Sequence, residues 1–376
     1  MIYIHIPFCK SKCAYCDFLS SAANPSPDGY AMAEGYTKAL LNELKTACEG
    51  DMKGRAIKTI YVGGGTPTAL PLPFLCAIIN GAKRFNLTND AEITVECNPG
   101  TLGTEGYAAL KSVGVNRLSI GLQAFLDPLL ARIGRSHTVE DFMLTFRAAR
   151  EVGFENINVD LMFSLPGQTM NDWRDALEKL VALRPEHISA YSLTPAEGTP
   201  LWEGLEEGGI VLPDDETDRA MYHEANRTLA AAGYRRYEIS NYALPGRESR
   251  HNVNTWKRLP YRGFGLGAHS FELDGGGGVR WYNTEDMEKY LRAQSPPYAP
   301  CREGYTPIEA EEAMAEAMIL GLRLTDGVVL QQNMQDRYGI KIEGLIADGL
   351  LAREKDRIYL TGLGTDLANR VFGAFI

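Results

Sequence analysis

Short runs of apolar, largely β-branched residues alternate with amphipathic stretches over residues 2–242. The apolar runs occupy residues 2–6, 57–62, 93–95, 118–122, 157–163, 188–193 and 237–239. Between them lie stretches with apolar residues at helical spacing, including residues 36–44, 142–152 and 173–183. Because strands that alternate with helices form βαβ units, this order predicts a parallel sheet. Six or seven such units favour an α/β fold of the partial, (β/α)6-type TIM-like barrel kind over an open, doubly wound sheet.

Polar and glycine residues directly follow the predicted strands. They are Gly63, Gly64, Gly65, Thr66, Glu96, Asn98, Gln123, Arg135 on the next loop, and Asp160 inside the fifth strand. Parallel barrels bring the carboxyl ends of their strands to one rim. We therefore expect these side chains to form one polar pocket, suited to a charged, zwitterionic ligand.

The pattern changes after residue 242, which predicts three parts. A barrel is expected over residues 1–242, an aromatic and glycine-rich segment over 243–300, and a small α+β part over 301–376. The four glycines at 275–278 predict a hairpin turn. Pro296, Pro297 and Pro300 indicate a linker.

The last part is expected to resemble a winged helix. We predict helices over residues 308–324, 330–338 and 342–348, followed by a strand pair near 351–353 and 357–360. Because the chain is acidic, we interpret this part as a packing or partner module and not as a DNA reader.

Composition and charge narrow the function classes. Hydrophobic residues make up 45% and charged residues 23% of the 376 residues, which excludes wholesale disorder. No apolar stretch reaches the roughly 20 residues that span a bilayer, so no transmembrane helix is expected. The first residues lack the features of a secretory signal, which indicates a cytoplasmic protein. The net charge of −10, without a Lys/Arg cluster, disfavours nucleic acid as a partner.

Three of the seven cysteines, Cys9, Cys13 and Cys16, lie within eight residues of one another, directly after the first predicted strand. An odd cysteine count without a secretion signal indicates a reducing compartment, and therefore thiolate ligands. Three thiolates can hold a 4Fe–4S cluster and leave its fourth iron open to an exchangeable ligand. Structural zinc, with His5 as a fourth ligand, is the alternative.

Four motifs give a resemblance to a known superfamily. The chain reads Tyr-Ile-His-Ile-Pro-Phe-Cys-x3-Cys-x2-Cys-Asp-Phe from Tyr3, Gly-Gly-Gly-Thr-Pro-Thr from Gly63, Glu-x-Asn-Pro from Glu96 and Ile-Gly-Leu-Gln from Ile120. In these motifs it resembles the radical S-adenosylmethionine (SAM) proteins of the oxygen-independent coproporphyrinogen oxidase superfamily. The resemblance extends over about residues 2–375.

The resemblance implies cofactors and the residues that bind them. A 4Fe–4S cluster would be held by Cys9, Cys13 and Cys16, with SAM on the open iron. The residues implied for SAM are Tyr3, Tyr15, Gly64, Gly65, Thr66, Glu96, Gln123, Arg135 and Asp160. Glu96 would pair with the ammonium group of SAM, and Gln123, Arg135 and Asp160 would contact its carboxylate, ribose or adenine. The resemblance also implies release of a 5′-deoxyadenosyl radical, chemistry that the cofactor supplies.

Two branches of the superfamily differ in features that the sequence shows. The decarboxylating oxidase has an extra cysteine two residues after the third ligand and an N-terminal extension. Here Phe18 occupies that position, and the first predicted strand begins at Ile2. Both features favour the heme chaperone (HemW) branch, which carries a His-Asn-x-x-Tyr-Trp motif. The chain reads His-Asn-Val-Asn-Thr-Trp from His251, so that Thr255 replaces the tyrosine.

The resemblance therefore implies a carrier that binds a 4Fe–4S cluster, SAM and heme and passes heme to an acceptor protein. His251 is the candidate heme ligand and His269 a second one, while Trp256, Tyr261 and Phe264 would offer apolar surface to a porphyrin. Oxygen-independent oxidation of coproporphyrinogen III in the same pocket is the enzymatic alternative, and no catalytic residue is assigned. A zinc-stabilised structural barrel is the third hypothesis.

Overall fold

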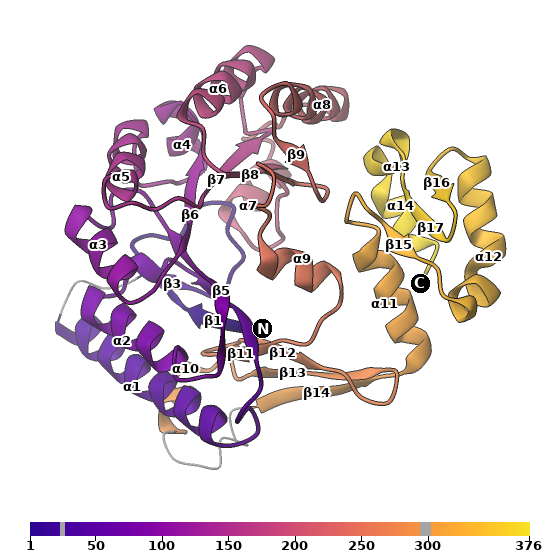
Figure 1. Ribbon diagram of the computed structural model, residues 1–376. Helices are drawn as coiled ribbons and strands as arrows, with labels where there is room; N and C mark the ends of the chain where they lie inside the picture. Colours follow the sequence, from indigo (N-terminus) through magenta and orange to yellow (C-terminus); the bar gives the residue numbers. More distant parts are fainter. Residues whose placement is uncertain (23–26, 294–301) are drawn as a thin grey trace.

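A nine-stranded sheet, curved into a partial barrel, forms the main part of the computed structural model, which describes residues 1–22, 27–293 and 302–376 (Figure 1). Neighbouring strands from β11 to β8 are parallel. At the other edge, β10 pairs antiparallel with β8, and β9 pairs antiparallel with β10. In sheet order the strands are β11 (Arg262–Phe264), β1 (Ile2–Ile6), β4 (Ile57–Gly64), β5 (Leu87–Cys97), β6 (Arg117–Gln123), β7 (Ile157–Phe163), β8 (His187–Ser192), β10 (Asn241–Ala243) and β9 (Arg235–Arg236). The predicted partial barrel is confirmed.

Helices alternate with these strands, and all of them except α4 and α7, which lie nearer the barrel axis, form a ring outside the barrel (Figure 1). They are α1 (Pro27–Glu49), α2 (Leu72–Ala82), α3 (Thr104–Ser112), α4 (Asp127–Arg132), α5 (Val139–Glu151), α6 (Met170–Leu183), α7 (Pro200–Glu206) and α8 (Asp215–Ala231). Capping boxes define the starts of two of them, because Thr138 and Thr169 each exchange hydrogen bonds with an aspartate three residues later. The short pair β2 (Phe8–Cys9) and β3 (Ser21–Ala22) flanks the cysteine loop.

The barrel strands alternate between an apolar outer face and a polar inner face. On β6, Leu118, Ile120 and Leu122 belong to the hydrophobic core formed with the helices. Arg117 and Ser119, which have the opposite parity, line the interior cavity. Since successive side chains of a strand point to opposite faces, one sequence pattern builds both the core and the site.

One predicted strand is absent. Residues 237–239 do not extend the sheet, and β10 (Asn241–Ala243), which pairs antiparallel with β8, occupies this place instead. The buried carboxylate of Glu238 accepts hydrogen bonds from the backbone N–H of Ser240 and from Nδ2 of Asn241, both at 2.7 Å. These local bonds turn the chain and therefore compete with strand pairing.

The segment after the barrel continues its sheet and then leaves it. β11 (Arg262–Phe264) pairs with β1, and α9 (Arg250–Trp256) packs against β4. The predicted hairpin at the glycine run is confirmed by the antiparallel pair β12 (His269–Glu272) and β13 (Gly278–Asn283). α10 (Met287–Arg292) and β14 (Arg302–Ile308) follow, and the predicted proline linker lies outside the described residues.

The C-terminal part has its own small hydrophobic core. It contains α11 (Ala310–Gly321), β15 (Val328–Val329), α12 (Gln332–Ala347), β16 (Leu351–Glu354), β17 (Arg357–Leu360), α13 (Gly362–Asp366) and α14 (Ala368–Gly373). The two helices predicted over 330–338 and 342–348 are one helix, because Gly339 costs only about 1 kcal/mol inside a helix that buries Tyr338 and Ile342. Among the described residues, no helix combines the length and apolarity that a membrane crossing needs.

Candidate functional site

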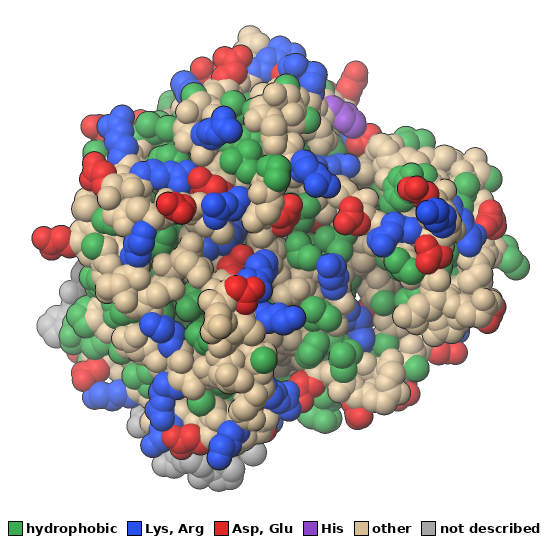
Figure 2. Space-filling model, in the orientation of Figure 1, with side chains coloured by type: hydrophobic (Ala, Val, Ile, Leu, Met, Phe, Trp, Pro, Cys, Tyr) green, Lys and Arg blue, Asp and Glu red, His purple; other side chains and the backbone are tan. Residues whose placement is uncertain are grey.

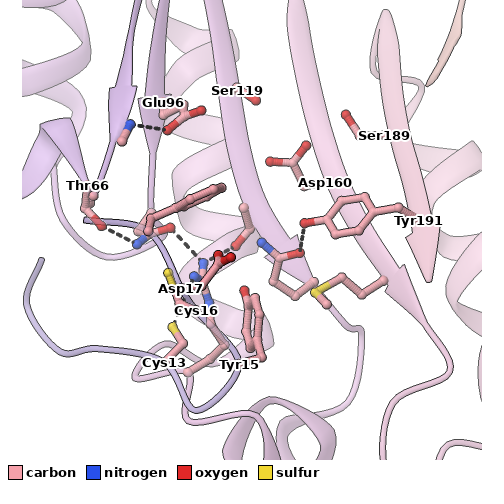
Figure 3. Close-up of a pocket in the computed structure, with 18 of the residues that line it drawn as sticks. Cys13, Tyr15, Cys16, Asp17, Thr66, Glu96, Ser119, Asp160, Ser189 and Tyr191 are labelled. Carbon is pink, nitrogen blue, oxygen red and sulfur yellow. Dashed lines mark hydrogen bonds between the residues drawn. The ribbon is translucent and has the colours of Figure 1, made fainter. Parts of the chain in front are cut away.

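The loop with the three clustered cysteines lies at the carboxyl end of the barrel strands (Figure 3). Two backbone hydrogen bonds hold it: Ala14 N donates to Ile133 O at 3.0 Å, and Leu201 N donates to Ala14 O at 2.8 Å. Cys9 is buried and the other two cysteines are partly exposed. All three line the same cavity, which therefore faces three thiols from one short loop.

The glycines at the end of β4 pack against the side chains of Glu96 and His5. A Cβ atom at Gly63 would lie 2.8 Å from the carboxyl carbon of Glu96. Gly64 has φ of +110°, and a Cβ there would lie 2.4 Å from Nδ1 of His5. Only glycine combines this backbone conformation with such close approach. The glycines thus allow the ends of β1, β4 and β5 to approach one another closely.

A chain of hydrogen bonds connects two of the cysteines. Arg135 Nη1 approaches Cys13 Sγ at 3.6 Å, and Arg135 Nη2 donates to Asn98 Oδ1 at 2.7 Å. Asn98 Nδ2 donates to Thr66 Oγ1 at 2.6 Å, and Thr66 Oγ1 donates to Cys9 Sγ at 3.5 Å. Figure 3 shows Thr66 and the cysteine loop in this network. The network holds the sulfur atoms in defined positions.

Two carboxyl groups lie buried in the interior. Glu96 accepts hydrogen bonds from the hydroxyl of Tyr61 at 2.7 Å and from Gly64 N at 3.2 Å. Burial raises the pKa of Glu96 to about 7, because ionisation without solvent is costly. Burial also raises the pKa of Asp160, which accepts a hydrogen bond from Asn158 Nδ2 at 2.7 Å. Neither carboxyl group has an ion-pair partner among the described residues, so a cationic ligand would complement them.

Gln123 adopts an unusual backbone conformation at the end of β6. Its φ is +70°, and the pairing of β6 with β7 shifts register between Gly121 and Gln123. The side chain accepts a hydrogen bond from the hydroxyl of Tyr191 at 3.1 Å. Non-glycine residues in the left-handed region cost of order 1–3 kcal/mol and are concentrated at functional sites. In this conformation the Gln123 side chain lines the cavity.

A cavity of about 670 Å³ lies among these groups, and Figure 3 shows side chains from several strands directed into it. The structure brings together all predicted cluster and SAM residues except Tyr3. The predicted residues that line the cavity are Cys9, Cys13, Cys16, Tyr15, Gly64, Gly65, Thr66, Glu96, Gln123, Arg135 and Asp160.

The deep end of the cavity contains polar residues that sequence reasoning missed. They include Arg117, Ser119, Asn158, Ser189, Asn241 and Asn252. Arg117 is only 2% exposed, and in the described part of the chain it has neither a hydrogen bond nor an ion pair from its side chain. The signal that could have found these groups is the recurrence of polar residues at alternate strand positions, as in Arg117-x-Ser-x-Gly-x-Gln.

Tyr3 and His5 lie on β1, next to the glycines at the end of β4. His5 Nε2 donates to Leu19 O at 2.7 Å, since a carbonyl can only accept. His5 Nδ1 therefore accepts from the hydroxyl of Tyr3, at 3.0 Å. Both ring nitrogens are engaged, which removes the fourth ligand of the zinc alternative. Tyr3 lines smaller neighbouring cavities and not the cavity with the cysteines.

His251 lies on α9, at the amino-terminal end of the barrel interior. Its Nδ1 is 2.9 Å from the hydroxyl of Thr59, and its backbone N–H donates to the carboxylate of Glu92 at 3.1 Å. Burial lowers its pKa to about 3, so the imidazole is neutral. It lines a cavity of about 330 Å³ together with Tyr61 and Glu96. His251 is therefore close to the barrel cavity but does not line it.

The aromatic groups proposed for a porphyrin are separated. Phe264 is completely buried on β11, so the expectation that it offers surface to a porphyrin is wrong. Tyr261 packs against Phe271, and the His269 ring stacks on Tyr282 at 5.2 Å. Trp256 remains partly exposed at the end of α9. Only Trp256 of these lies on the same helix as His251.

The residues present fit the cluster and SAM that the motifs imply. The two buried carboxyl groups can complement the positive charge of a zwitterion. Arg135, whose buried Nε has no hydrogen-bond partner in the described structure, can complement its negative charge. No three His, Cys, Asp or Glu side chains of the described residues converge on one metal-ion position. A 4Fe–4S cluster does not require such convergence, because each thiolate binds a different iron.

Comparisons with known proteins agree with this site. Residues 3–180 match the Radical SAM superfamily model, and residues 308–367 match the HemN C-terminal domain. The chain is 38% identical to "Heme chaperone HemW" of Bacillus subtilis over 100% of this chain and 98% of that protein. It is 39% identical to the protein of the same name from Escherichia coli, over 71% of this chain and 69% of that protein.

A solved structure shares the fold. Coproporphyrinogen III oxidase (HemN) from Escherichia coli superposes with a TM-score of 0.82 at 21% identity, over 100% of this chain and 89% of that one. The barrel and its cysteine-lined cavity thus define a radical SAM protein, and this class implies a 4Fe–4S cluster and SAM. Within this class, the relatives that match over the full length of the chain show the family. The chain belongs to the heme chaperone HemW family.

Proposed function

We propose that this protein is a heme carrier that holds a 4Fe–4S cluster and SAM, binds heme and passes it to an acceptor protein. The observation that carries the proposal is the full-length likeness to proteins named heme chaperone HemW. The fit of the cavity to a cluster and a zwitterion supports the same assignment. A cytoplasmic location belongs to the proposal, since the three thiols need a reducing compartment.

The side chains of the cavity define how each cofactor would be held. The thiolates of Cys9, Cys13 and Cys16 would hold the cluster, and Arg135, fixed by Asn98, would meet the carboxylate of SAM. Glu96 would meet its ammonium group. When bound together, the cluster and SAM supply one-electron chemistry. The protein contributes binding, orientation and the exclusion of water by the buried walls.

Helix α9 carries the groups proposed for heme. The neutral imidazole of His251 is chemically competent to ligate iron, since Nδ1 faces Thr59 and leaves Nε2 for a ligand. The cavity on this side, about 330 Å³, lies at the lower end of the usual range for ligand sites. His251 is therefore one contact to test, and Trp256, on the same helix, is the other.

Anaerobic reconstitution with iron and sulfide, followed by heme titration, tests the proposal. We expect about four irons per chain, SAM binding and saturable heme binding, followed by transfer to an apo-acceptor. Absence of saturable heme binding in the reconstituted protein would refute the carrier function. His251→Ala tests ligation separately: a change in the Soret spectrum on substitution is expected only if the imidazole binds iron.

The oxidase alternative receives support at the level of the fold alone, from the structural likeness to HemN. An anaerobic assay with reductant, SAM and coproporphyrinogen III separates the two activities. We expect no protoporphyrinogen from preparations that bind SAM and heme. Formation of protoporphyrinogen at many turnovers per chain would instead establish the enzyme.

A further inference from the structure

A second large cavity lies on the other side of α9 (Arg250–Trp256) from the barrel interior. It is a groove of about 950 Å³ lined by residues of α9 and of the C-terminal part. Figure 1 shows that α9 faces the C-terminal part. Asn252 of α9 lines the barrel cavity, whereas the next residue, Val253, lines the groove together with Trp256. From the C-terminal part, Val328 and Val329 form the facing wall. One short helix thus separates the two cavities.

Basic side chains surround this groove. Lys58, Arg235 and Lys257 line it, and none of the three has a carboxylate partner within residues 1–22, 27–293 and 302–376. Arg250 and Arg357 line it as well. The acidic residues among its described lining are Glu248 and Asp326. Figure 2 shows basic side chains, with acidic ones among them, on both sides of the furrow between the barrel and the C-terminal part. On a chain of net charge −10, a groove of opposite charge favours an anionic ligand.

The same groove has an apolar wall. Val253 and Trp256 are half-buried, Leu324 is nearly buried, and Val329 remains 44% exposed on β15. The guanidinium of Arg323 lies 4.3 Å from the centre of the Trp256 ring, and this cation–π contact helps to hold the indole in place. A surface that combines an apolar wall with unpaired cations suits a flat amphiphile with carboxylate groups.

We infer that this groove is the docking site for heme: the apolar wall receives the porphyrin and the cations receive its two propionates. The inference rests on the proposed heme carrier function. The volume of about 950 Å³ lies within the usual range of roughly 300–1,000 Å³ for ligand sites, and it is nearly three times that of the cavity beside His251. The groove therefore accommodates a tetrapyrrole where the smaller cavity is restricted by Tyr61 and Glu96.

The groove offers no strong iron ligand. No His, Cys or Met is among its described lining residues, and the hydroxyl of its one tyrosine, Tyr237, is 2.8 Å from Nε2 of His187. Heme held by its porphyrin and propionates keeps its iron free for an axial ligand of the acceptor. A carrier that must release its cargo gains from this arrangement, because no iron–protein bond has to break.

Charge reversal tests the inference on the full-length, reconstituted protein. The test protein carries Lys58→Glu, Arg235→Glu and Lys257→Glu. The control carries Lys45→Glu, Lys53→Glu and Arg147→Glu, three exposed residues outside the groove that give the same change in net charge. We expect the first triple variant to bind heme at least roughly tenfold more weakly, with less dependence on salt, and the control to resemble the wild type. Unchanged SAM affinity in both variants verifies that the barrel is intact.

Porphyrin analogues separate the groove from ligation by His251. Metal-free protoporphyrin should bind about as tightly as heme, and its dimethyl ester, which lacks the carboxylate charges, should bind much more weakly. Heme binding that is unchanged in the groove variant and lost in His251→Ala would overturn the groove but leave the carrier function in place. No saturable heme binding in the wild type would overturn the carrier function itself.

Discussion

Asn98 Nδ2 donates a hydrogen bond to the hydroxyl of Thr66 at 2.6 Å, and this contact joins the loops that follow β5 and β4. The other end of the Asn98 amide accepts from Arg135, which approaches Cys13, while Thr66 donates to Cys9. A single amide therefore connects the surroundings of two thiols that lie four residues apart in the loop. Its role is positional, since Asn98 itself contacts neither sulfur.

Replacing Asn98 by Ala should weaken cluster retention. The substitution removes two hydrogen bonds at once, each with a net value of about 1 kcal/mol, and leaves Arg135 less constrained. We expect cluster loss to a chelator to become several-fold faster, measured from the decay of visible absorption under anaerobic conditions. Asn86→Ala, which removes an exposed hydrogen bond to Gly54 O, is the control. Equal rates for all three proteins would contradict the positional role.

Gly64→Ala should destabilise the protein more than an ordinary glycine substitution. Position 64 combines positive φ with a Cβ position 2.4 Å from the His5 ring, whereas Gly54 has φ of +76° and open space around its Cβ. Gly54→Ala thus measures backbone strain alone, of order 1 kcal/mol. We expect Gly64→Ala to cost about 1–3 kcal/mol more, from overpacking, in urea unfolding of the apo protein. Similar losses for the two variants would show that the His5 ring moves aside freely.

SAM affinity should rise with pH in a way that depends on Glu96. Since its pKa is raised to about 7, the carboxyl is mostly neutral at pH 6 and mostly ionised at pH 8. Only the ionised form attracts the ammonium group, so the affinity gains up to about tenfold over this range. Glu96→Gln should bind more weakly and lose this component. Titration of the SAM amine itself is common to both proteins, and identical pH profiles would exclude Glu96 as the partner.

Arg117→Met should stabilise the apo protein. The guanidinium is buried without a partner in the described structure, and a methionine of similar length removes a desolvated charge. We expect a gain of about 1–3 kcal/mol in urea unfolding, against less than about 0.5 kcal/mol for Arg147→Met at an exposed position. Because Arg117 lowers the pKa values of Glu96 and Asp160, the pH profile of SAM binding should move to higher pH in the variant. A large loss of stability would instead indicate that the guanidinium holds the interior together.

The fold was predictable because strand and helix periodicities differ clearly over residues 2–193. The prediction was wrong where local hydrogen bonds overrode the pattern, as at Glu238, whose carboxylate turns the chain before β10. It was wrong again in the C-terminal part, where the two helices predicted over residues 330–338 and 342–348 form the single helix α12, with Gly339 inside it. Tertiary burial of Tyr338 and Ile342 outweighs the cost of that glycine.

The candidate site was largely predictable from the residues at the strand ends, since topology alone brings these to one rim. Its interior was harder to predict, because a single polar residue within a strand, such as Arg117, does not by itself show whether it faces the barrel or the solvent; only its alternation with Ser119 and Gln123 indicates a shared inner face. The place of Tyr3 was also missed, for its motif says nothing of the hydrogen bond to His5. The aromatic segment gave no indication that Phe264 would join the core through β11.

The seven residues of α9 have a consequence for the coupling of ligands. Side-chain contacts attach the helix to the barrel: His251 contacts Thr59, Glu92 accepts from two backbone N–H groups of the helix, and Arg250 binds Asp90. A displacement of α9 therefore breaks few hydrogen bonds and changes both the barrel cavity and the groove. If ligand binding in the barrel cavity displaces α9 and thereby changes the affinity of the groove for its ligand, thermodynamic reciprocity requires that binding in the groove change the affinity of the barrel cavity by the same factor.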